Sequence, residues 1–251
     1  MLTFRTILSY IQFVSETSHV DSRTLRERTT AHVRRMVVYG EIRPGEHVVE
    51  VPLSKTLGVS RGTLRESLRA LESEGLLVAD GSGHLLVRQL SSARVLEVYE
   101  IREALEVIAA ARVARRTDVA LPVAELRQTL APLQDPGLGF AEQIDADMRF
   151  HQKLCEVSGN QTLLESWNRL LGQIEMIIID TGPIRASGRM RYDDHDTIVS
   201  AIATGDPIYA EAAVRAHMRA FCNAYVADAI ARETRVPSLD QPPEQPSHTN
   251  A

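Results

Sequence analysis

The sequence has few of the residues that would mark a secreted, disulfide-bonded or membrane-spanning protein. Its two cysteines, Cys155 and Cys222, form no CxxC or zinc-finger spacing and are most simply buried thiols. No apolar run approaches the roughly 18 residues of a membrane span. Residues 1–20 mix apolar with polar side chains and lack a clear cleavage site, so no signal peptide is expected. These absences favour a cytoplasmic protein with no membrane partner.

Neither sign of charge dominates the first part of the chain. Residues 1–90 carry about +2 and residues 91–251 about −7, within a total of −5. An acidic protein can still bind DNA when its positive charge is local, because affinity depends on the phosphates that it neutralises. The local charge comes from Arg23, Arg26, Arg34, Arg35, Lys55, Arg61, Arg65 and Arg69. A randomly solvated surface is the alternative.

Residues 53–77 predict two short helices joined by a tight turn. Gly58 can adopt the positive φ that ends a helix, and Ser60 stands where the N-cap of the next helix belongs. That helix then has apolar residues at helical spacing: Leu64, Leu68 and Leu71. Arg61 and Arg65 lie on the other side near its N-terminus, from which guanidinium groups can reach base edges in a DNA major groove. The alternative is an ordinary helix pair with a solvated face.

Two short apolar runs, 76–78 and 85–87, follow with a glycine-rich turn between them, and predict a β-hairpin. A hairpin directly after such a helix is a wing. Over residues 24–90 the order and spacing of motifs resemble the GntR family of bacterial transcription regulators. The matching residues are Gly40, Pro44-Gly45, Glu50, Leu53-Ser54, Leu57 to Arg61, Leu64 to Glu66, Leu68, Leu71, Glu74 to Leu76, and Gly83.

This resemblance implies a winged helix-turn-helix domain over residues 22–90, preceded by an extension at 1–21, and a homodimer on a double-stranded DNA operator. Its predicted DNA-binding residues are Lys55, Ser60, Arg61, Thr63, Arg65, Gly83 and His84. The sequence departs from the family at two places. Gly62-Thr63 replaces a frequent Pro-Val or polar pair, and Val51 replaces a basic residue that some members use on DNA.

Residues 91–232 predict an antiparallel bundle of about six helices, so the fold is mainly α. Ser91-Ser92 caps a helix to about residue 116, and further helices are expected at about 118–130, 140–157, 160–180, 187–203 and 207–232. The apolar side predicted for the first of them consists of Leu96, Val98, Ile101, Leu105 and Ile108. Residues 233–251 combine four prolines with polar residues and are predicted to be disordered.

Four polar residues of the bundle fall at positions where apolar ones are expected: Asp147, His151, His195 and His217. Burying unpaired polar groups is costly. A single buried histidine is usually a hydrogen-bonded core residue, but three with an aspartate on inward faces of three helices indicate a metal site. Asp147 and His151, four residues apart, can bind one ion. Imidazole and carboxylate suit zinc, nickel or manganese. A hydrogen-bonded polar core is the alternative.

This second half resembles the FCD effector domain of the FadR-type branch of the GntR family. The resemblance covers residues 91 to about 225, through Arg102, Glu106, Asp147, Phe150-His151, Ser158 to Asn160, Leu163, His195, Ile198, Ile202, Gly205-Asp206, Ala212-Ala213 and Met218. Metal-binding members use one aspartate and three histidines, which carry over to Asp147, His151, His195 and His217. The helix count is more similar to the VanR subgroup.

Members of this branch bind small organic acids beside or onto the metal. Arg102 is the first effector candidate, because a guanidinium can pair with a carboxylate through two hydrogen bonds. A structural role, either an intrahelical pair with Glu106 or packing on the Val98 side, carries equal weight. Asn160 is the second candidate, although a helix cap is the simpler role for it.

Two functions follow from these patterns. The first is a homodimeric repressor whose operator binding is controlled by a small carboxylate. The second is a metal-dependent hydrolase, since a three-histidine site with open positions can activate water. The enzyme needs a general base and an oxyanion stabiliser near the metal. No second carboxylate is evident there, and residues 24–90 would be left unexplained, so the repressor is favoured.

Overall fold

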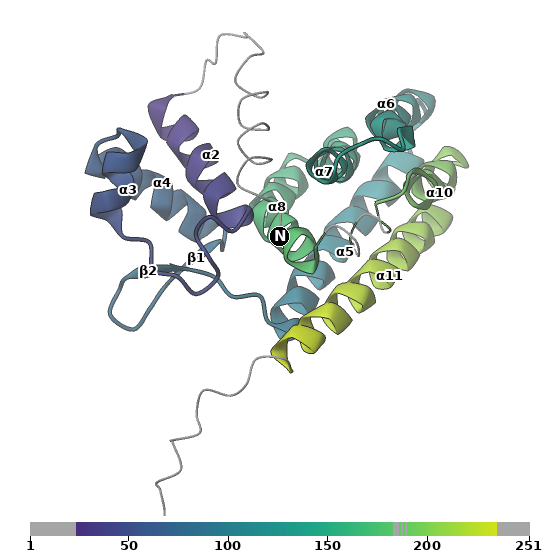
Figure 1. The fold of residues 1–251 in the computed structure, drawn as a ribbon. Coiled ribbons are helices and arrows are strands. Elements are labelled where there is room, and N and C mark those ends of the chain that lie inside the picture. The colour runs from purple at the N-terminus through teal and green to yellow at the C-terminus, as the bar shows by residue number, and fades with distance from the viewer. Residues whose placement is uncertain (1–23, 183–185, 187, 189, 235–251) are drawn as a thin grey trace, which may run out of the picture.

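The computed structural model describes residues 24–182, 186, 188 and 190–234, and it is mainly α (Figure 1). The extension predicted at 1–21 lies outside these residues, as does nearly all of the tail predicted at 233–251. None of the described helices combines the length and the apolar character that crossing a membrane requires.

The first three helices begin and end where local hydrogen bonding dictates. Helix α2 (Leu25–Val38) begins at Thr24, whose hydroxyl accepts the backbone N–H of Glu27 at 3.2 Å. Helix α3 (Glu50–Leu57) ends at Gly58, with φ of 65°. Helix α4 (Arg61–Ser73) begins at Ser60, whose Oγ accepts the N–H of Thr63 at 3.1 Å. The predicted helix stop and N-cap are therefore confirmed.

The predicted wing is present. Strand β1 (Leu77–Ala79) pairs antiparallel with β2 (Leu85–Val87), with Leu77 opposite Val87. Strand β1 starts one residue later than predicted, because the N–H of Leu76 still bonds the carbonyl of Leu71 at the end of α4. At the tip, the Asp80 carboxylate accepts the N–H groups of Ser82 and His84.

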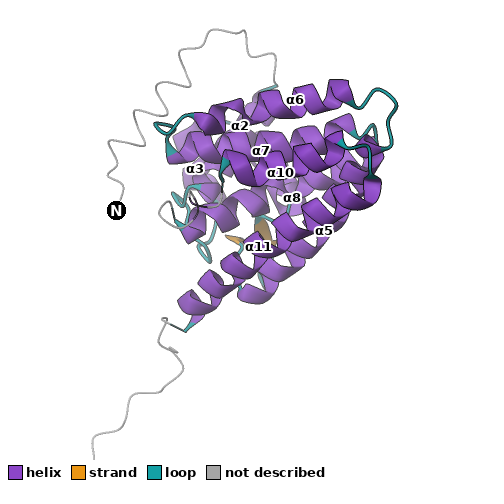
Figure 2. Cartoon of the chain, turned by 90° about the vertical axis from the view of Figure 1, so that its right-hand side faces the viewer, coloured by secondary structure: helices purple, strands orange, loops and turns teal. Residues whose placement is uncertain are grey.

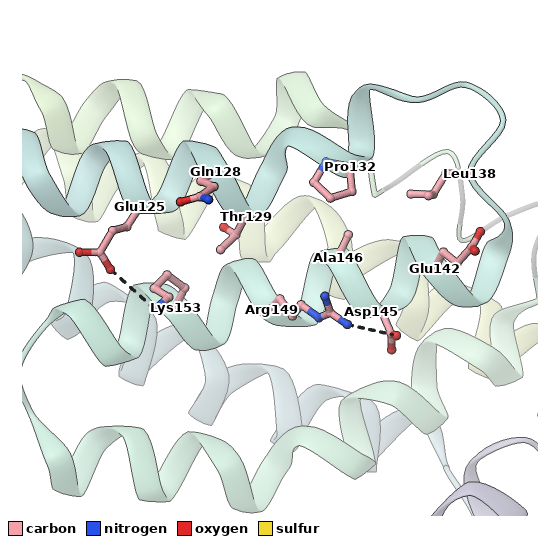
Figure 3. Close-up of a pocket in the computed structure, with 10 residues that line it drawn as sticks. All are labelled: Glu125, Gln128, Thr129, Pro132, Leu138, Glu142, Asp145, Ala146, Arg149 and Lys153. Carbon is pink, nitrogen blue, oxygen red and sulfur yellow. Dashed lines mark ion pairs between the residues drawn. The ribbon is translucent and has the colours of Figure 1, made fainter. Parts of the chain in front are cut away.

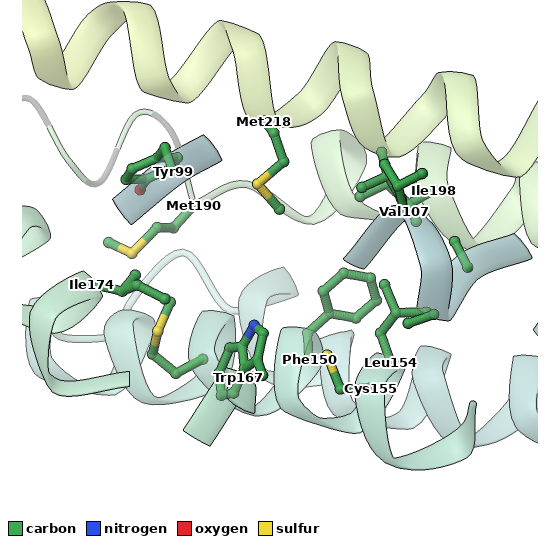
Figure 4. Close-up of a cluster of buried hydrophobic side chains, with 14 of the residues drawn as sticks. Tyr99, Val107, Phe150, Leu154, Cys155, Trp167, Ile174, Met190, Ile198 and Met218 are labelled. Atoms are coloured by element: carbon green, nitrogen blue, oxygen red, sulfur yellow. The ribbon is translucent and has the colours of Figure 1, made fainter. Parts of the chain in front are cut away.

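The second half is a bundle of six described α-helices with one short 3₁₀ turn (Figure 2). These are α5 (Ser92–Ala114), α6 (Ala120–Leu130), η1 (Ala131–Gln134), α7 (Phe140–Val157), α8 (Gln161–Thr181), α10 (Tyr192–Ala203) and α11 (Pro207–Glu233). Helix α5 packs along α11, and α7 lies against α5, α6 and α8. The core they enclose includes Trp167, Phe150, Leu154, Ile174 and Ile198 (Figure 4).

Two helix starts differ from the prediction. Helix α6 begins at Ala120 rather than at Asp118, whose carboxylate is held by Arg116 at 2.7 Å instead of capping the helix. Helix α10 begins at Tyr192, five residues later than predicted, because the backbone of Arg191 is extended.

The apolar face predicted for α5 is wrong at three of its five residues, whereas Val98 is buried and Leu105 packs against the core. Leu96, Ile101 and Ile108 are 45%, 54% and 49% exposed. Besides Val98, the face turned to the bundle carries Val95, Tyr99, Arg102, Glu106, Val107, Ala109, Ala110 and Val113. Alanines allow α11 to approach closely, and two charged side chains take core positions because they pair with each other. A search for large apolar residues therefore selects the wrong side.

The winged domain rests on α8. Met176 of α8 joins the core formed by α2, α4 and the wing. Gly172 leaves room for Leu76, since a Cβ at this position would lie 2.8 Å from a Leu76 methyl group. The Gln173 amide donates to the carbonyl of Glu74 at 2.7 Å, and its oxygen accepts from Arg94 at 2.6 Å. The two domains are thus in direct contact.

Candidate metal centre and nucleic-acid interface

Three imidazoles meet inside the bundle, one from each of three helices. His151 of α7, His195 of α10 and His217 of α11 are buried, and a ring nitrogen of each lies within 4.8 Å of one on each of the others. The Nε2 atoms of His151 and His195 are 3.2 Å apart. Side chains separated by more than 20 residues in sequence therefore converge on one point.

Asp147 completes the group. Its Oδ1 lies 2.8 Å from Nε2 of His195, and its Oδ2 lies 3.9 Å from Nε2 of His151. Asp147 and His151 are one helical turn apart on α7, so both side chains point in the same direction. The structure thus brings together the residues predicted as metal ligands.

The outer nitrogens of two rings are already occupied. Nδ1 of His151 lies 2.6 Å from Oε2 of Glu106. Nδ1 of His195 lies 2.8 Å from the backbone carbonyl of Arg191, to which it can only donate. Partners on the outer nitrogen fix the orientation of an imidazole and leave its other nitrogen directed inward, as in the supporting shell of metal sites.

The electrostatics suit a cation. Burial, together with the charge of Arg102, lowers the pKa of His151 well below its usual value. Burial and the other two imidazoles do the same to the pKa of His217. Burial opposes ionisation of Asp147, but His195 and His151 outweigh it and lower the pKa of that carboxyl. For His195, Asp147 outweighs burial and raises the pKa.

His151 and His217 are thus held neutral beside an ionised carboxylate, which is the form that binds a metal. His195, whose pKa is raised, would give up its proton when a cation binds. The donor set of three nitrogens and one oxygen, with its outer hydrogen bonds in place, fits a divalent first-row ion.

The sequence interpretation considered Glu106 only as a partner of Arg102 and did not place it beside the histidines. It is fully buried and accepts from Nε of Arg102 and from the indole N–H of Trp167, both at 2.9 Å. The expectation that no second carboxylate lies near the site is therefore wrong. The sequence did offer one indication of it. Arg102 and Glu106 lie one turn apart on a predicted helix of the bundle. Three hydrogen-bonding partners hold this carboxylate in place, which suits support of His151 better than proton transfer.

The predicted DNA-binding residues lie on or beside α4 and at the wing tip. Lys55, Arg61, Arg65, Gly83 and His84 are exposed. Nε of Arg65 donates to Glu50 of α3 at 2.7 Å. Ser60 and Thr63 share a hydroxyl contact of 2.9 Å in addition to the capping bond, so both shape the start of α4. A groove of about 860 Å³ runs between α4 and the wing, with Arg65, Arg69 and His84 in its lining.

Comparisons with known proteins agree with both halves. The profile of "Bacterial regulatory proteins, gntR family" matches residues 25–87, and the FCD domain profile matches residues 97–220. The uncharacterized HTH-type transcriptional regulator YdhC of Bacillus subtilis is 31% identical over 196 residues, covering 76% of this chain and 86% of that protein. This chain belongs to the GntR family. It is a DNA-binding transcription regulator with an FCD domain, and not an enzyme.

Three further proteins are similar to this chain over most of their length. The Nta operon transcriptional regulator of Aminobacter aminovorans is 31% identical over 186 residues, covering 73% of this chain and 86% of that protein. The gluconate operon transcriptional repressor of Bacillus licheniformis is 25% identical over 192 residues, covering 71% of this chain and 76% of that protein. The solved structure of E. coli McbR/YncC has a TM-score of 0.66 at 20% identity, covering 82% of this chain and 98% of that one, and supports the fold.

The two effector candidates in this GntR-family chain occupy different surroundings. Arg102 is buried, and besides Glu106 it reaches the hydroxyl of Tyr99 at 3.3 Å. Burial opposes its charge, but Glu106 outweighs burial and raises the pKa of Arg102, so the guanidinium stays charged. Asn160 caps α8, its Oδ1 accepting the N–H of Leu163 at 3.2 Å. The arrangement of Arg102 is the intrahelical pair that the sequence left open.

A surface groove of about 460 Å³ between α6 and α7 is separate from these residues (Figure 3). Its lining carries two ion pairs, Lys153 with Glu125 at 3.6 Å and Arg149 with Asp145 at 3.7 Å. None of the predicted metal or effector residues lines it, so we assign it no part in the candidate site.

Proposed function

We propose that this GntR-family regulator is a homodimeric cytoplasmic repressor of the VanR-like subgroup. Its operator binding is controlled by a small organic acid bound at a divalent metal site in the helical domain. The proposed domains are residues 22–90 for DNA binding and 91–232 for sensing. The observation that carries the proposal is the buried group of Asp147, His151, His195 and His217, joined through Glu106 to the helix on which the winged domain rests.

These four side chains would hold zinc, nickel or manganese. Such an ion, when bound, offers coordination positions to a carboxylate oxygen. Glu106 keeps the ring of His151 in place, and Arg102 keeps a positive charge close by for an anionic effector. Asn160 is the weaker effector candidate, because its side chain already caps α8.

Helix α8 links the sensing site to the DNA-binding domain. Near its middle, Trp167 donates to Glu106. Between one and three turns further on, Gly172, Gln173 and Met176 contact the winged domain. A change at Glu106 is therefore transmitted along one rigid element to the surface that positions α4.

On DNA, Arg61 and Arg65 would lie near base edges, Lys55 on a phosphate, and Gly83 with His84 near the minor groove or backbone. The ion pair with Glu50 holds Arg65 across the start of α3. An effector can change operator affinity only by its differential affinity for the two domain arrangements, typically about 1–3 kcal/mol, or about 5–150-fold. For an induced repressor this change is a decrease.

The test uses metal-loaded full-length protein. Thermal-shift screening of sugar acids, hydroxy acids, dicarboxylates and aromatic acids finds an effector, because a ligand that binds only the folded state raises the melting temperature. Selection from random DNA then yields the operator, expected to be a short palindrome. Operator affinity should fall by about 5–150-fold with the effector. A tightly bound acid that leaves operator affinity unchanged would contradict the sensor.

Arg102 needs a careful variant. Replacement by alanine would leave the Glu106 carboxylate buried without its ion partner, which typically costs about 3–5 kcal/mol. Arg102→Lys keeps the charge but loses the planar pair of donors. It should weaken effector binding while metal content and effector-free operator binding stay near the wild-type values. Wild-type effector affinity in this variant would assign Arg102 a structural role.

A further inference from the structure

The outward face of α5 is exposed in the described part of the chain, and it is apolar at its centre. Ile101 and Ile108 are 54% and 49% exposed, Ala104 lies between them, and Leu105 is half-buried at the edge. Isolated exposed apolar residues are common on protein surfaces. These residues instead form one continuous stripe, because positions 101, 104 and 108 follow helical spacing.

Charges of opposite sign stand at the two ends of this stripe. Glu97 lies one turn before Ile101, and Arg112 lies one turn after Ile108, both exposed. In the single chain, Arg94 contacts Glu97 at 2.9 Å, and Nε of Arg112 donates to the carbonyl of Ser158 at 3.1 Å. Glu97 and Arg112 thus place an acidic side chain before the apolar centre and a basic one after it. Arg94, which donates to Gln173, and Arg115 lie beyond them.

We propose that a second copy of this chain packs on this face, with the two α5 helices antiparallel about a two-fold axis between residues 104 and 105. The axis places Ile101 opposite Ile108 of the second copy, and Ala104 opposite Leu105. It also places Glu97 opposite Arg112 at both ends of the contact. A self-complementary surface of this kind is what a two-fold interface requires.

The inference rests on the proposed homodimer and specifies where it forms. The self-complementary pattern favours a second copy over an unrelated partner. Only a second copy is certain to present the same residues in the matching order. The opposite face of α5 carries Arg102 and Glu106. One helix would then hold the subunit contact on one side and the support of the metal site on the other.

The first test measures oligomeric state by light scattering after gel filtration, on metal-loaded full-length protein. Wild type should have twice the mass of one chain. Replacing both isoleucines, Ile101→Glu with Ile108→Glu, should raise the dimer dissociation constant by at least about 100-fold, since it places four like charges in the contact. Leu121→Glu is the matched control, because Leu121 is 65% exposed but lies on α6. That variant should remain dimeric.

The second test determines the register. Chains carrying Ile101→Cys and chains carrying Ile108→Cys should form disulfide-linked dimers when mixed and oxidised. Each chain alone should form almost none. In this register the two copies of residue 101 would stand about 10 Å apart along the helix axis. That separation is too far for a disulfide. Glu97→Arg should weaken the dimer, and adding Arg112→Glu in the same chain should restore it.

The outcomes separate this inference from the proposed function. If the isoleucine variant stays dimeric, or if crosslinks form equally in unmixed chains, the α5 interface is wrong while the homodimer stands. If wild type is monomeric both free and on its operator, the homodimer and the interface fail together. Effector control of operator binding is measured independently of both. Loss of the dimer only in the α5 variants, with normal metal content, supports the interface.

Discussion

Glu175 offers a sensitive probe of the contact between the two domains. It lies on α8, partly buried, with the charges of Arg34, Asp145 and Glu74 nearby. Arg34 and Glu74 pair with each other and so hold α2 against the end of α4. Burial raises the pKa of Glu175 from 4.5 to about 7, against the opposing effect of Arg34. At neutral pH and above, the folded protein must therefore ionise a carboxyl group in an unfavourable place.

The size of this effect follows from the two pKa values. Because the folded state holds this proton more tightly than the unfolded state, stability falls as pH rises from about 4.5 through about 7. Above that range the loss is constant at about 3 kcal/mol. Glu175→Gln retains the shape of the protonated side chain and cannot ionise. The variant should be more stable than wild type by about 3 kcal/mol at pH 8 and by less than about 1 kcal/mol at pH 5.

The assay is urea unfolding of both proteins at pH 5 and pH 8, with the same metal load. Comparing the two proteins at each pH cancels every other titrating group. Glu165→Gln, an exposed glutamate on the same helix, serves as control and should change stability little at either pH. An equal stability difference between wild type and Glu175→Gln at the two pH values would refute the reasoning. So would a variant that is less stable at pH 8.

Three further predictions concern DNA, metal and coupling. Arg65→Ala should cost about 1–3 kcal/mol of operator binding and relax preference at one base pair, whereas Lys55→Ala should weaken all sequences alike and flatten the salt dependence, both measured by binding titrations. Elemental analysis should find one divalent ion per chain, lost in His195→Ala with a lower melting temperature, and less affected in Asp147→Asn, since an amide oxygen can still coordinate. Gln173→Ala should leave effector affinity near normal but reduce the effector's influence on operator affinity, and undiminished influence would exclude Gln173 from the coupling.

Local patterns in the sequence were sufficient for much of the DNA-binding half and for some helix ends in the bundle. The positive φ of Gly58 and the capping by Ser60 and Asn160 depend on residues within three positions along the chain, so composition and spacing determine them. The wing follows in the same way from two apolar runs and a turn. The inward placement of Asp147, His151, His195 and His217 was also detectable, because polar residues at inward helical positions are exceptions to a strong rule.

Only tertiary structure decided which face of α5 is buried, and what surrounds the histidines. Glu106 becomes a support for His151 because α5, α7 and α8 meet there, bringing together residues 45 and 61 positions apart. The burial of Arg102 depends on that same carboxylate. Hydrophobic periodicity considers only how apolar each side chain is. The buried face of α5 instead consists largely of alanines and an internal ion pair, which allow α11 to pack closely against it. No local pattern carries that information, since it depends on which other helices arrive at the contact.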